Sequence, residues 1–190
     1  MKKIFILLGH TDKETLSGAF ADRYEAAARA AGHEVRRMNI GEMHFDPILH
    51  KGYKVIQQLE PDLTDFQEAV RWCNHFVVIY PCWWSGMPAM LKGLFDRAWI
   101  PGFCFRYAHH GLTWSKLLKG RTGRVIVSEN TPPWLLWFMY GSTTTEISSA
   151  ILGFTGIRTR VTEFGPSERA SAKTHAKWIK KVERLGQKGI

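Results

Sequence analysis

The feature that most constrains the fold is a regular alternation between short apolar runs and longer stretches with helical periodicity. Runs of strand length occupy residues 3–9, 34–40, 75–80, 123–128 and 158–164. Nearly unbroken apolar runs of this kind are typical of strands buried on both faces of a parallel sheet. Helices between such strands require right-handed crossovers. The sequence therefore predicts an α/β fold, a doubly wound five-stranded parallel sheet with helices on both faces.

The stretches between the runs predict helices with identifiable first and last residues. An apolar stripe runs from Leu16 to Ala31, and Gly32 follows as a C-terminal cap. Proline suits a first helical position, and Ser or Thr followed by Glu suits a helix start. On these signals we expect helix starts at Pro61 and Pro88, a capping box of Thr143 with Glu146, and a cap of the last helix at Ser167.

Length and composition predict a single domain over residues 1–190, because 45% of the residues are hydrophobic and neither a repeat nor a linker interrupts them. No apolar run approaches the roughly 18 residues of a membrane span, and the basic, apolar start is expected to be a buried strand rather than a signal peptide. Cys73, Cys82 and Cys104 have no CxxC spacing, so we expect reduced thiols and a cytoplasmic protein. The adjacent His109 and His110 are not expected to bind a metal.

The net charge of +9 is confined to the second half of the chain. Residues 1–95 contain 11 basic and 11 acidic side chains, whereas residues 96–190 contain 15 and 6. Such a surface suits nucleic acid or a phosphorylated cofactor. A solvated basic face on the last helix is the simpler alternative.

Ligands of a doubly wound sheet bind at the carboxyl ends of its strands, where three loops are expected. The first, residues 9–18, reads GHTDKETLSG and matches neither GxGxxG nor GxxxxGK[ST]. It offers the His10 imidazole, hydroxyl groups and free backbone N–H groups at a helix start, which together suit a phosphate. An ordinary helix cap by Thr15 or Ser17, with His10 uninvolved, is the alternative.

The second loop, residues 81–88, reads PCWWSGMP and contains two adjacent tryptophans. Large aromatic side chains are costly to expose, so Trp83 and Trp84 are expected to cover something. A flat aromatic ligand would suit them, with Ser85 and Gly86 allowing backbone amides to approach its polar edge. Packing of both rings into the core or a subunit contact is the alternative.

The third loop begins with ENTPP at residues 129–133 and continues into the apolar run WLLWFMY at 134–140. The consecutive prolines predict that no helix forms there, so the apolar run would lie in a long connection. It would then be a lid over the site or a dimer contact.

Two of these loops carry a resemblance to a known family. His10 is followed at the family's spacing by Thr15-Leu16-Ser17, residues 80–97 read YPCWWSGMPAMLKGLFDR, and residues 102–105 read GFCF. From residue 3 to about residue 165, the chain resembles the NAD(P)H:quinone oxidoreductase branch of the flavodoxin-like superfamily. That branch includes quinone reductases, azoreductase-like proteins and potassium-efflux ancillary proteins.

The resemblance implies a flavodoxin-like fold and a non-covalent flavin, with NAD(P)H as electron donor. It also implies a ping-pong mechanism: hydride passes to flavin N5, the nucleotide leaves, and two electrons pass to a quinone-like acceptor. FMN is favoured over FAD because no adenine-binding segment extends the domain. By resemblance, His10, Thr15, Leu16 and Ser17 would hold the phosphate, while Pro81, Cys82, Trp83, Trp84 and Ser85 would line the isoalloxazine edge.

The third loop departs from the family pattern. Relatives carry Thr-Thr-Gly-Gly after the fourth strand, then a Tyr and a His that assist hydride transfer. This chain has Glu-Asn-Thr-Pro at 129–132, and no histidine follows until His175. Asn130 and Thr131 are expected to bond the pyrimidine edge, and Tyr140 is expected to take the catalytic place of the family Tyr.

Family members are typically homodimers, and the apolar run at 134–140 independently suggests association. Two functions of other classes compete with the quinone reductase. One is a flavin-binding regulatory subunit of a partner such as a transporter. The other is a basic relative that binds nucleic acid without flavin, but the expected partners are NAD(P)H and a quinone-like acceptor, not nucleic acid.

Overall fold

The computed structural model describes residues 1–108 and 113–190, so His109 and His110 lie outside the described residues. Its main sheet is five-stranded and parallel, in the order β2-β1-β3-β6-β7. All five predicted strands are confirmed within a residue or two at each end. They are β1 (Lys3–Leu8), β2 (Glu34–Asn39), β3 (His75–Pro81), β6 (Thr122–Ser128) and β7 (Arg158–Phe164).

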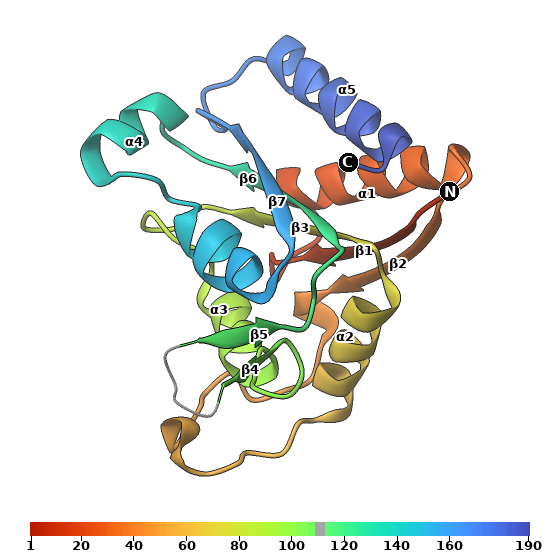
Figure 1. The fold of residues 1–190 in the computed structure, drawn as a ribbon. Coiled ribbons are helices and arrows are strands. Elements are labelled where there is room, and N and C mark those ends of the chain that lie inside the picture. The colour runs from red at the N-terminus through yellow and green to blue at the C-terminus, as the bar shows by residue number, and fades with distance from the viewer. Residues whose placement is uncertain (109–112) are drawn as a thin grey trace.

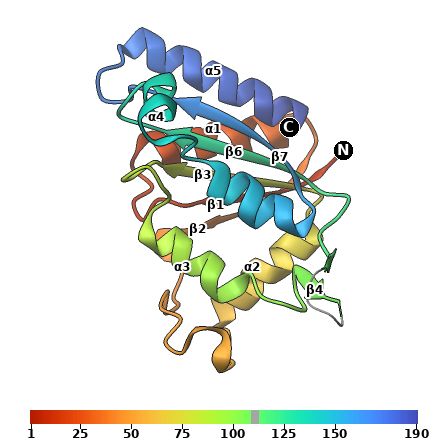
Figure 2. The ribbon, with the colours of Figure 1, turned by 60° about the vertical axis from the view of Figure 1, so that its left-hand side comes forward.

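Helices cover both faces of this sheet, as predicted (Figures 1 and 2). Helix α1 (Leu16–Ala30) packs along α5 (Ala172–Lys188) on one face. The other face carries α2 (Pro61–Trp72), α3 (Ala89–Ala98) and the π-helical segment η3 (Glu146–Gly153). Short 3-10 turns, η1 (Ile40–Glu42) and η2 (Gly52–Lys54), lie in the connection between β2 and α2. No helix of the described residues is both long and apolar enough to cross a membrane.

The core forms as two apolar layers because successive side chains of a strand point to opposite faces. On β1, Phe5 and Leu7 belong to the layer under α2 and α3, whereas Ile4, Ile6 and Leu8 belong to the layer under α1 and α5. All five side chains are fully buried. This two-sided burial explains why the strand reads as an unbroken apolar run.

A buried arginine on α3 forms hydrogen bonds to the long connection between β2 and α2. The side chain of Arg97, on α3, is fully buried, and its guanidinium donates to Glu60 Oε2 at 2.7 Å. It also donates to the backbone carbonyls of Asp46 and of Gln58. The connection therefore has a defined path although it contains little regular structure.

The prediction that no helix follows the two prolines is wrong. Helix α4 (Pro133–Tyr140) starts there, with Pro132 at its N-cap and Pro133 in its first turn. Proline is disfavoured inside a helix, but the N–H that it lacks is unpaired in the first turn of any helix. Figure 1 shows α4 standing away from the sheet.

Two other sequence expectations are wrong. The cap of α5 is Ser171, whose side chain accepts from the Thr174 N–H, rather than Ser167. Thr143 does not cap η3; its hydroxyl donates to Glu129 instead. Between α3 and β6 the chain also forms a small antiparallel pair, β4 (Phe105–Tyr107) with β5 (Trp114–Lys116).

Gly18 supplies a stability test, because a Cβ at this position would lie 1.8 Å from the Lys13 carbonyl oxygen. We expect Gly18→Ala to lower the free energy of unfolding by about 1–3 kcal/mol, since the loop before α1 must move. Denaturant unfolding measures the change. Gly86→Ala is the control, since a Cβ there would meet only the Trp83 carbonyl at 3.9 Å. Equal losses of unfolding free energy in both variants would contradict the conclusion that the close contact with Lys13 requires glycine at position 18.

Candidate functional site

The strand order places the expected binding crevice between β1 and β3. The winding of the chain reverses at this pair, and crevices form at the carboxyl ends of strands where this happens. A cavity of about 280 Å³ lies there, and all three predicted loops contribute to it. Its lining consists of His10, Thr15, Leu16, Ser17, Pro81, Cys82, Trp83, Ser128, Asn130, Ser167 and Glu168.

The first loop presents the start of α1 to this cavity. The Thr15 hydroxyl accepts from the Gly18 N–H at 3.3 Å and so caps the helix. Within the described residues, the backbone N–H groups of Leu16 and Ser17 have no acceptor. His10 is held beside them, because its Nδ1 accepts from the Asp12 N–H at 2.8 Å. Unpaired N–H groups and the positive end of the helix dipole suit an anionic group such as a phosphate.

Ser17 links this helix start to the sheet. Its hydroxyl oxygen lies 3.2 Å from that of Ser128, the last residue of β6, and both side chains are buried. Ser128 in turn accepts from the Cys82 N–H through its carbonyl at 2.8 Å. The three loops therefore meet at Ser128, which the sequence analysis did not single out.

The second loop is a tight turn in an unusual conformation. The backbones of Trp83 and Gly86 bond each other in both directions, at 2.9 and 3.0 Å. Trp84 and Ser85 between them have φ angles of 52° and 60°, as a type I′ turn requires. Residues other than glycine pay about 1–3 kcal/mol each in this region, a strain that clusters at functional sites.

This turn separates the two tryptophans. The Trp83 ring meets the His10 ring edge-on, with centroids 5.3 Å apart, and borders the cavity. The Trp84 side chain is fully exposed. Neither ring is in the core, so the core-packing alternative is wrong for both.

The third loop contributes Asn130. Its side-chain oxygen accepts from the Ser167 hydroxyl at 3.1 Å and from the Glu168 N–H at 3.2 Å. Asn130 thereby holds the connection between β7 and α5 at the cavity, and this connection adds Ser167 and Glu168 to the lining.

The structure brings eight of the eleven predicted cofactor residues to the cavity, the exceptions being Trp84, Ser85 and Thr131. The predicted catalytic Tyr140 lies on α4 and is 63% exposed, outside the cavity lining. Sequence reasoning missed Ser128 and Glu168, and it assigned Ser167 to a helix cap. Only the position of Ser128, last in an apolar run, signalled a role at this edge.

Glu129 is a buried carboxyl group at the same end of β6. It is 1% exposed, and its Oε1 accepts from the Thr143 hydroxyl at 2.9 Å. Oε2 has no partner within the described residues. Burial raises the pKa of Glu129 to about 7, which the bond from Thr143 only partly opposes. The group can therefore take up or release a proton near neutral pH.

Two further groups face Glu129 across the strand ends. Burial also raises the pKa of Glu163 on β7. Burial, followed by the nearby Glu129 carboxylate, raises the pKa of Cys82 to about 11. The Cys82 thiol is therefore protonated at neutral pH, which argues against a thiolate nucleophile. No metal-binding group of three His, Cys, Asp or Glu side chains occurs among the described residues.

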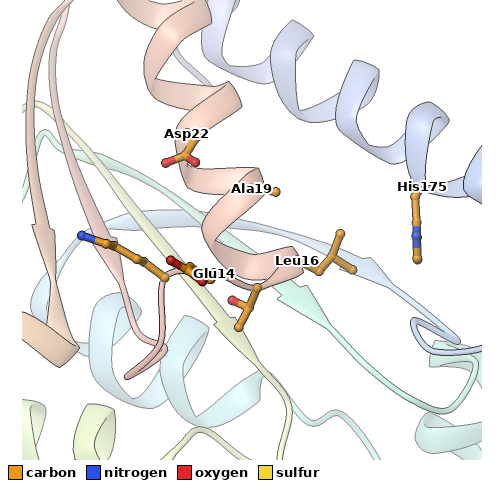
Figure 3. A pocket seen from close by; sticks show the side chains of 7 residues that line it. Glu14, Leu16, Ala19, Asp22 and His175 are labelled. Carbon is orange, nitrogen blue, oxygen red and sulfur yellow. The ribbon is translucent and has the colours of Figure 1, made fainter.

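A wider hollow of about 820 Å³ adjoins the cavity between α1 and α5. Figure 3 shows Leu16 and Ala19 from α1 on one side and His175 from α5 on the other. Its charged lining residues are Lys13, Glu14 and Asp22, so the carboxylates outnumber the cation. The narrower cavity has a single carboxylate residue, Glu168, and contains the unpaired N–H groups at the helix start, which makes it the better phosphate position.

Curated proteins similar to this chain are mostly NAD(P)H oxidoreductases by name. "NAD(P)H dehydrogenase [quinone] 1" of Cavia porcellus is 27% identical over 129 residues, covering 57% of this chain and 46% of that protein. "Ribosyldihydronicotinamide dehydrogenase [quinone]" of Homo sapiens is 35% identical over 148 residues, covering 67% and 63%. The chain spans about half the length of the curated relatives it matches.

Solved structures resemble the whole chain. A Streptococcus mutans protein, Smu.1420, superposes with a TM-score of 0.86 at 26% identity and covers 98% of this chain and 99% of its own. An NAD(P)H:quinone oxidoreductase from Methanothermobacter marburgensis superposes at 0.84, with 20% identity and 100% and 99% coverage. An FMN-dependent NADH-azoreductase from Bacillus anthracis, in complex with FMN, superposes at 0.74, with 18% identity and 99% coverage of both chains.

The family comparison agrees with this topology. The profile described as "Flavodoxin-like fold" matches residues 2–184, nearly the whole chain. With the observed strand order and the position of the cavity, this match confirms the resemblance in the sequence: the chain belongs to the flavodoxin-like fold family.

Proposed function

We propose that this protein is a flavin-dependent NAD(P)H oxidoreductase that reduces a quinone-like acceptor by two electrons. The observation that carries the proposal is the cavity at the β1–β3 edge, where unpaired N–H groups at the start of α1 face a tryptophan-containing turn. The names of the relatives support the same reaction class.

The residues present fit a flavin. The N–H groups of Leu16 and Ser17, beside His10, would hold its phosphate. Trp83 and the backbone of the strained turn would lie along the ring system. FMN is our choice over FAD, since a structural neighbour of similar length is an FMN complex. When bound, the flavin would accept a hydride from NAD(P)H and pass two electrons on.

We place donor and acceptor in one site. Both NAD(P)H and the acceptor would have to reach the flavin ring beside Trp83. They would therefore bind one after the other, which is a ping-pong scheme. Glu129 would serve this site by holding a proton one residue from Asn130 and Ser128, both of which line the cavity. Tyr140 would have to approach from α4, which lies outside the cavity lining here.

Helix α4 supports the assembly part of the proposal. None of its residues is buried, and its exposed side chains include Trp137 at 67% and Phe138 at 80%. A short helix that is apolar on all sides needs a cover. We propose that a second copy covers it in a homodimer, placing α4 against the partner's site.

A cytoplasmic location belongs to the same proposal, because all three cysteines are free thiols. A regulatory flavoprotein subunit is the second candidate, but no observation here favours it. Turnover on a quinone separates the two, since a regulatory subunit would bind flavin without it.

The first prediction concerns the flavin itself. The protein should bind one flavin per chain, released on denaturation and measurable by fluorescence, and NADPH or NADH should bleach its colour with turnover on a quinone.

Ser17→Glu should weaken FMN affinity about tenfold to a hundredfold by placing a carboxylate against the phosphate. The exposed Ser149→Glu is the control.

Because Ser17 is buried, the unfolding transition of the variant must be measured alongside its affinity, and Ser17→Ala provides a milder change. A protein that neither contains flavin nor takes up FMN or FAD contradicts the proposal. A folded Ser17→Glu variant with unchanged FMN affinity would show that the flavin phosphate does not bind beside Ser17.

The second prediction is a pH dependence from Glu129. Its folded-state pKa of about 7 lies above the ordinary 4.5, so its protonation favours the folded state, and this contribution is lost as pH rises through that interval. The wild type should therefore lose free energy of unfolding between pH 5 and pH 8, whereas Glu129→Gln has no carboxyl to ionise at this position. The difference between variant and wild type should change in favour of the variant by on the order of 2–3 kcal/mol over this interval. Denaturant unfolding at both pH values measures this.

The exposed Glu68→Gln is the matched control and should shift stability equally at pH 5 and pH 8. A Glu129→Gln difference that is the same at both pH values would show that the carboxyl is ionised throughout.

The third prediction tests the homodimer. Burying side chains of this size is worth roughly 1.5–3 kcal/mol each, so Trp137→Ser with Phe138→Ser should shift the protein toward monomer. Light scattering reports the mass, and quinone turnover should fall with it. The exposed pair Tyr53→Ser with Ile56→Ser, in the distant β2–α2 connection, is the control. A monomeric wild type contradicts the assembly, and a dissociated variant with full turnover contradicts its coupling to the site.

A further inference from the structure

A second cavity lies at the opposite edge of the sheet from the proposed flavin site. Its volume is about 350 Å³, within the range of small-molecule sites. Strand β6, seven residues long, has one end in each cavity, so the two lie about 20 Å apart. The lining residues are Lys2, His75, Thr122, Gly123, Arg124, Arg158, Thr159, Arg160 and Ile190.

Strand register concentrates positive charge around this cavity. Thr122 pairs with Arg158, and Arg124 pairs with Arg160, across the parallel strands β6 and β7. Residues paired in this way point to the same face of a sheet, and so do alternate residues along a strand. The three arginines therefore share one face, and Lys2 adds a fourth cation from the residue before β1.

None of these four cations forms an ion pair. Within the described residues, no Asp, Glu or C-terminal carboxylate oxygen lies within 4.0 Å of any of them. The carboxylate of Ile190 belongs to a residue that also lines the cavity, and Lys2 Nζ donates to the Gly189 carbonyl at 2.6 Å. Arg37 and Arg97 elsewhere in the chain each have an acidic partner. Cations crowded without a counter-charge repel one another, and a bound anion would relieve that repulsion.

Two buried side chains of the lining have unused polar atoms. Arg124 is 6% exposed, and its Nη1 donates to Thr162 Oγ1 at 3.2 Å while its Nε has no partner in the described part of the chain. His75 is 1% exposed, and its Nε2 likewise has no partner. Buried polar atoms without partners are rare in folded proteins and call for an explanation.

The environment of His75 suits a neutral donor. Burial, and then the charges of Lys2 and Arg124, lower its pKa to about 3. Its Nδ1 lies 2.7 Å from the Thr122 hydroxyl. The hydroxyl also lies 3.5 Å from the Asn74 carbonyl. When it donates to the nearer Nδ1, the ring proton is on Nε2, a nitrogen that is enclosed by protein on a residue of the cavity lining.

We propose that this cavity, lined by Arg124, Arg158, Arg160 and Lys2, binds the phosphate of a small phosphorylated metabolite. Several guanidinium groups around one cavity match the several oxygens and double charge of a phosphate better than a single carboxylate. Its hollow form suits a compact ligand rather than a long polyanion. The site is independent of the proposed flavin chemistry.

Calorimetric titration of the full chain with inorganic phosphate and with glycerol 3-phosphate tests the proposal, with ionic strength held constant by sodium chloride. We expect saturable binding that Arg160→Gln weakens at least about tenfold. Arg106→Gln removes the same charge from an exposed position on β4 and should change affinity less than twofold. Because Arg160 is exposed, its loss should not prevent folding.

Binding should also shift the ring nitrogen resonances of His75 in the wild type, a readout that does not depend on activity. The proposal is overturned if no binding occurs beyond the effect of ionic strength, or if both arginine variants lose affinity equally. It is also overturned if Ser17→Glu, rather than Arg160→Gln, abolishes phosphate binding. A short DNA duplex that binds far more tightly than glycerol 3-phosphate would instead indicate a polyanion surface.

Discussion

Pairing of β1 with β3 is the constraint on which the rest of the structure depends. The ladder runs from Ile4 opposite His75 to Leu8 opposite Ile79, with both faces covered by apolar layers. Because the chain winds away from this pair in both directions, the loops after β1 and β3 diverge and leave a crevice. Gly9 continues the pairing through its N–H to the Ile79 carbonyl at 2.7 Å. The site therefore lies at the ends of two paired strands that are buried on both faces.

The carboxyl edge combines free donors with stored strain. The start of α1 keeps backbone N–H groups unpaired, and the turn after β3 holds Trp84 and Ser85 in the left-handed region. The strained turn costs free energy in the protein, and a bound anion would supply the acceptors that the N–H groups at the helix start lack. Glu129 adds a buried carboxyl group at the same edge. Because its pKa is about 7, the carboxyl is partly ionised at pH 7, and its protonation would respond to an anionic ligand at the adjacent Asn130.

The two edges of the sheet would attract anions in different ways. At the carboxyl edge, the positive groups are backbone N–H groups at a helix start, with acidic side chains close by. At the amino edge they are the side chains of Arg124, Arg158 and Arg160. Three buried residues of β6, Val125, Ile126 and Val127, separate the two linings, so ligands at the edges would not compete sterically. The surplus of basic residues in the second half of the chain is thus only partly on the surface of α5.

The sequence by itself determined the five strands, the α/β class and most of the cavity lining, because these follow from local periodicity and from loops that a parallel sheet must bring to one edge. It did not determine the strand order, which depends on long-range pairing. Proline at 132–133 misled the prediction, since a helix start tolerates what a helix interior does not. Only the tertiary structure revealed that Ser128 joins three loops, that Glu129 is buried with a raised pKa, and that register sets Arg124 beside Arg160. Such properties depend on which strands become neighbours, and no local pattern encodes that.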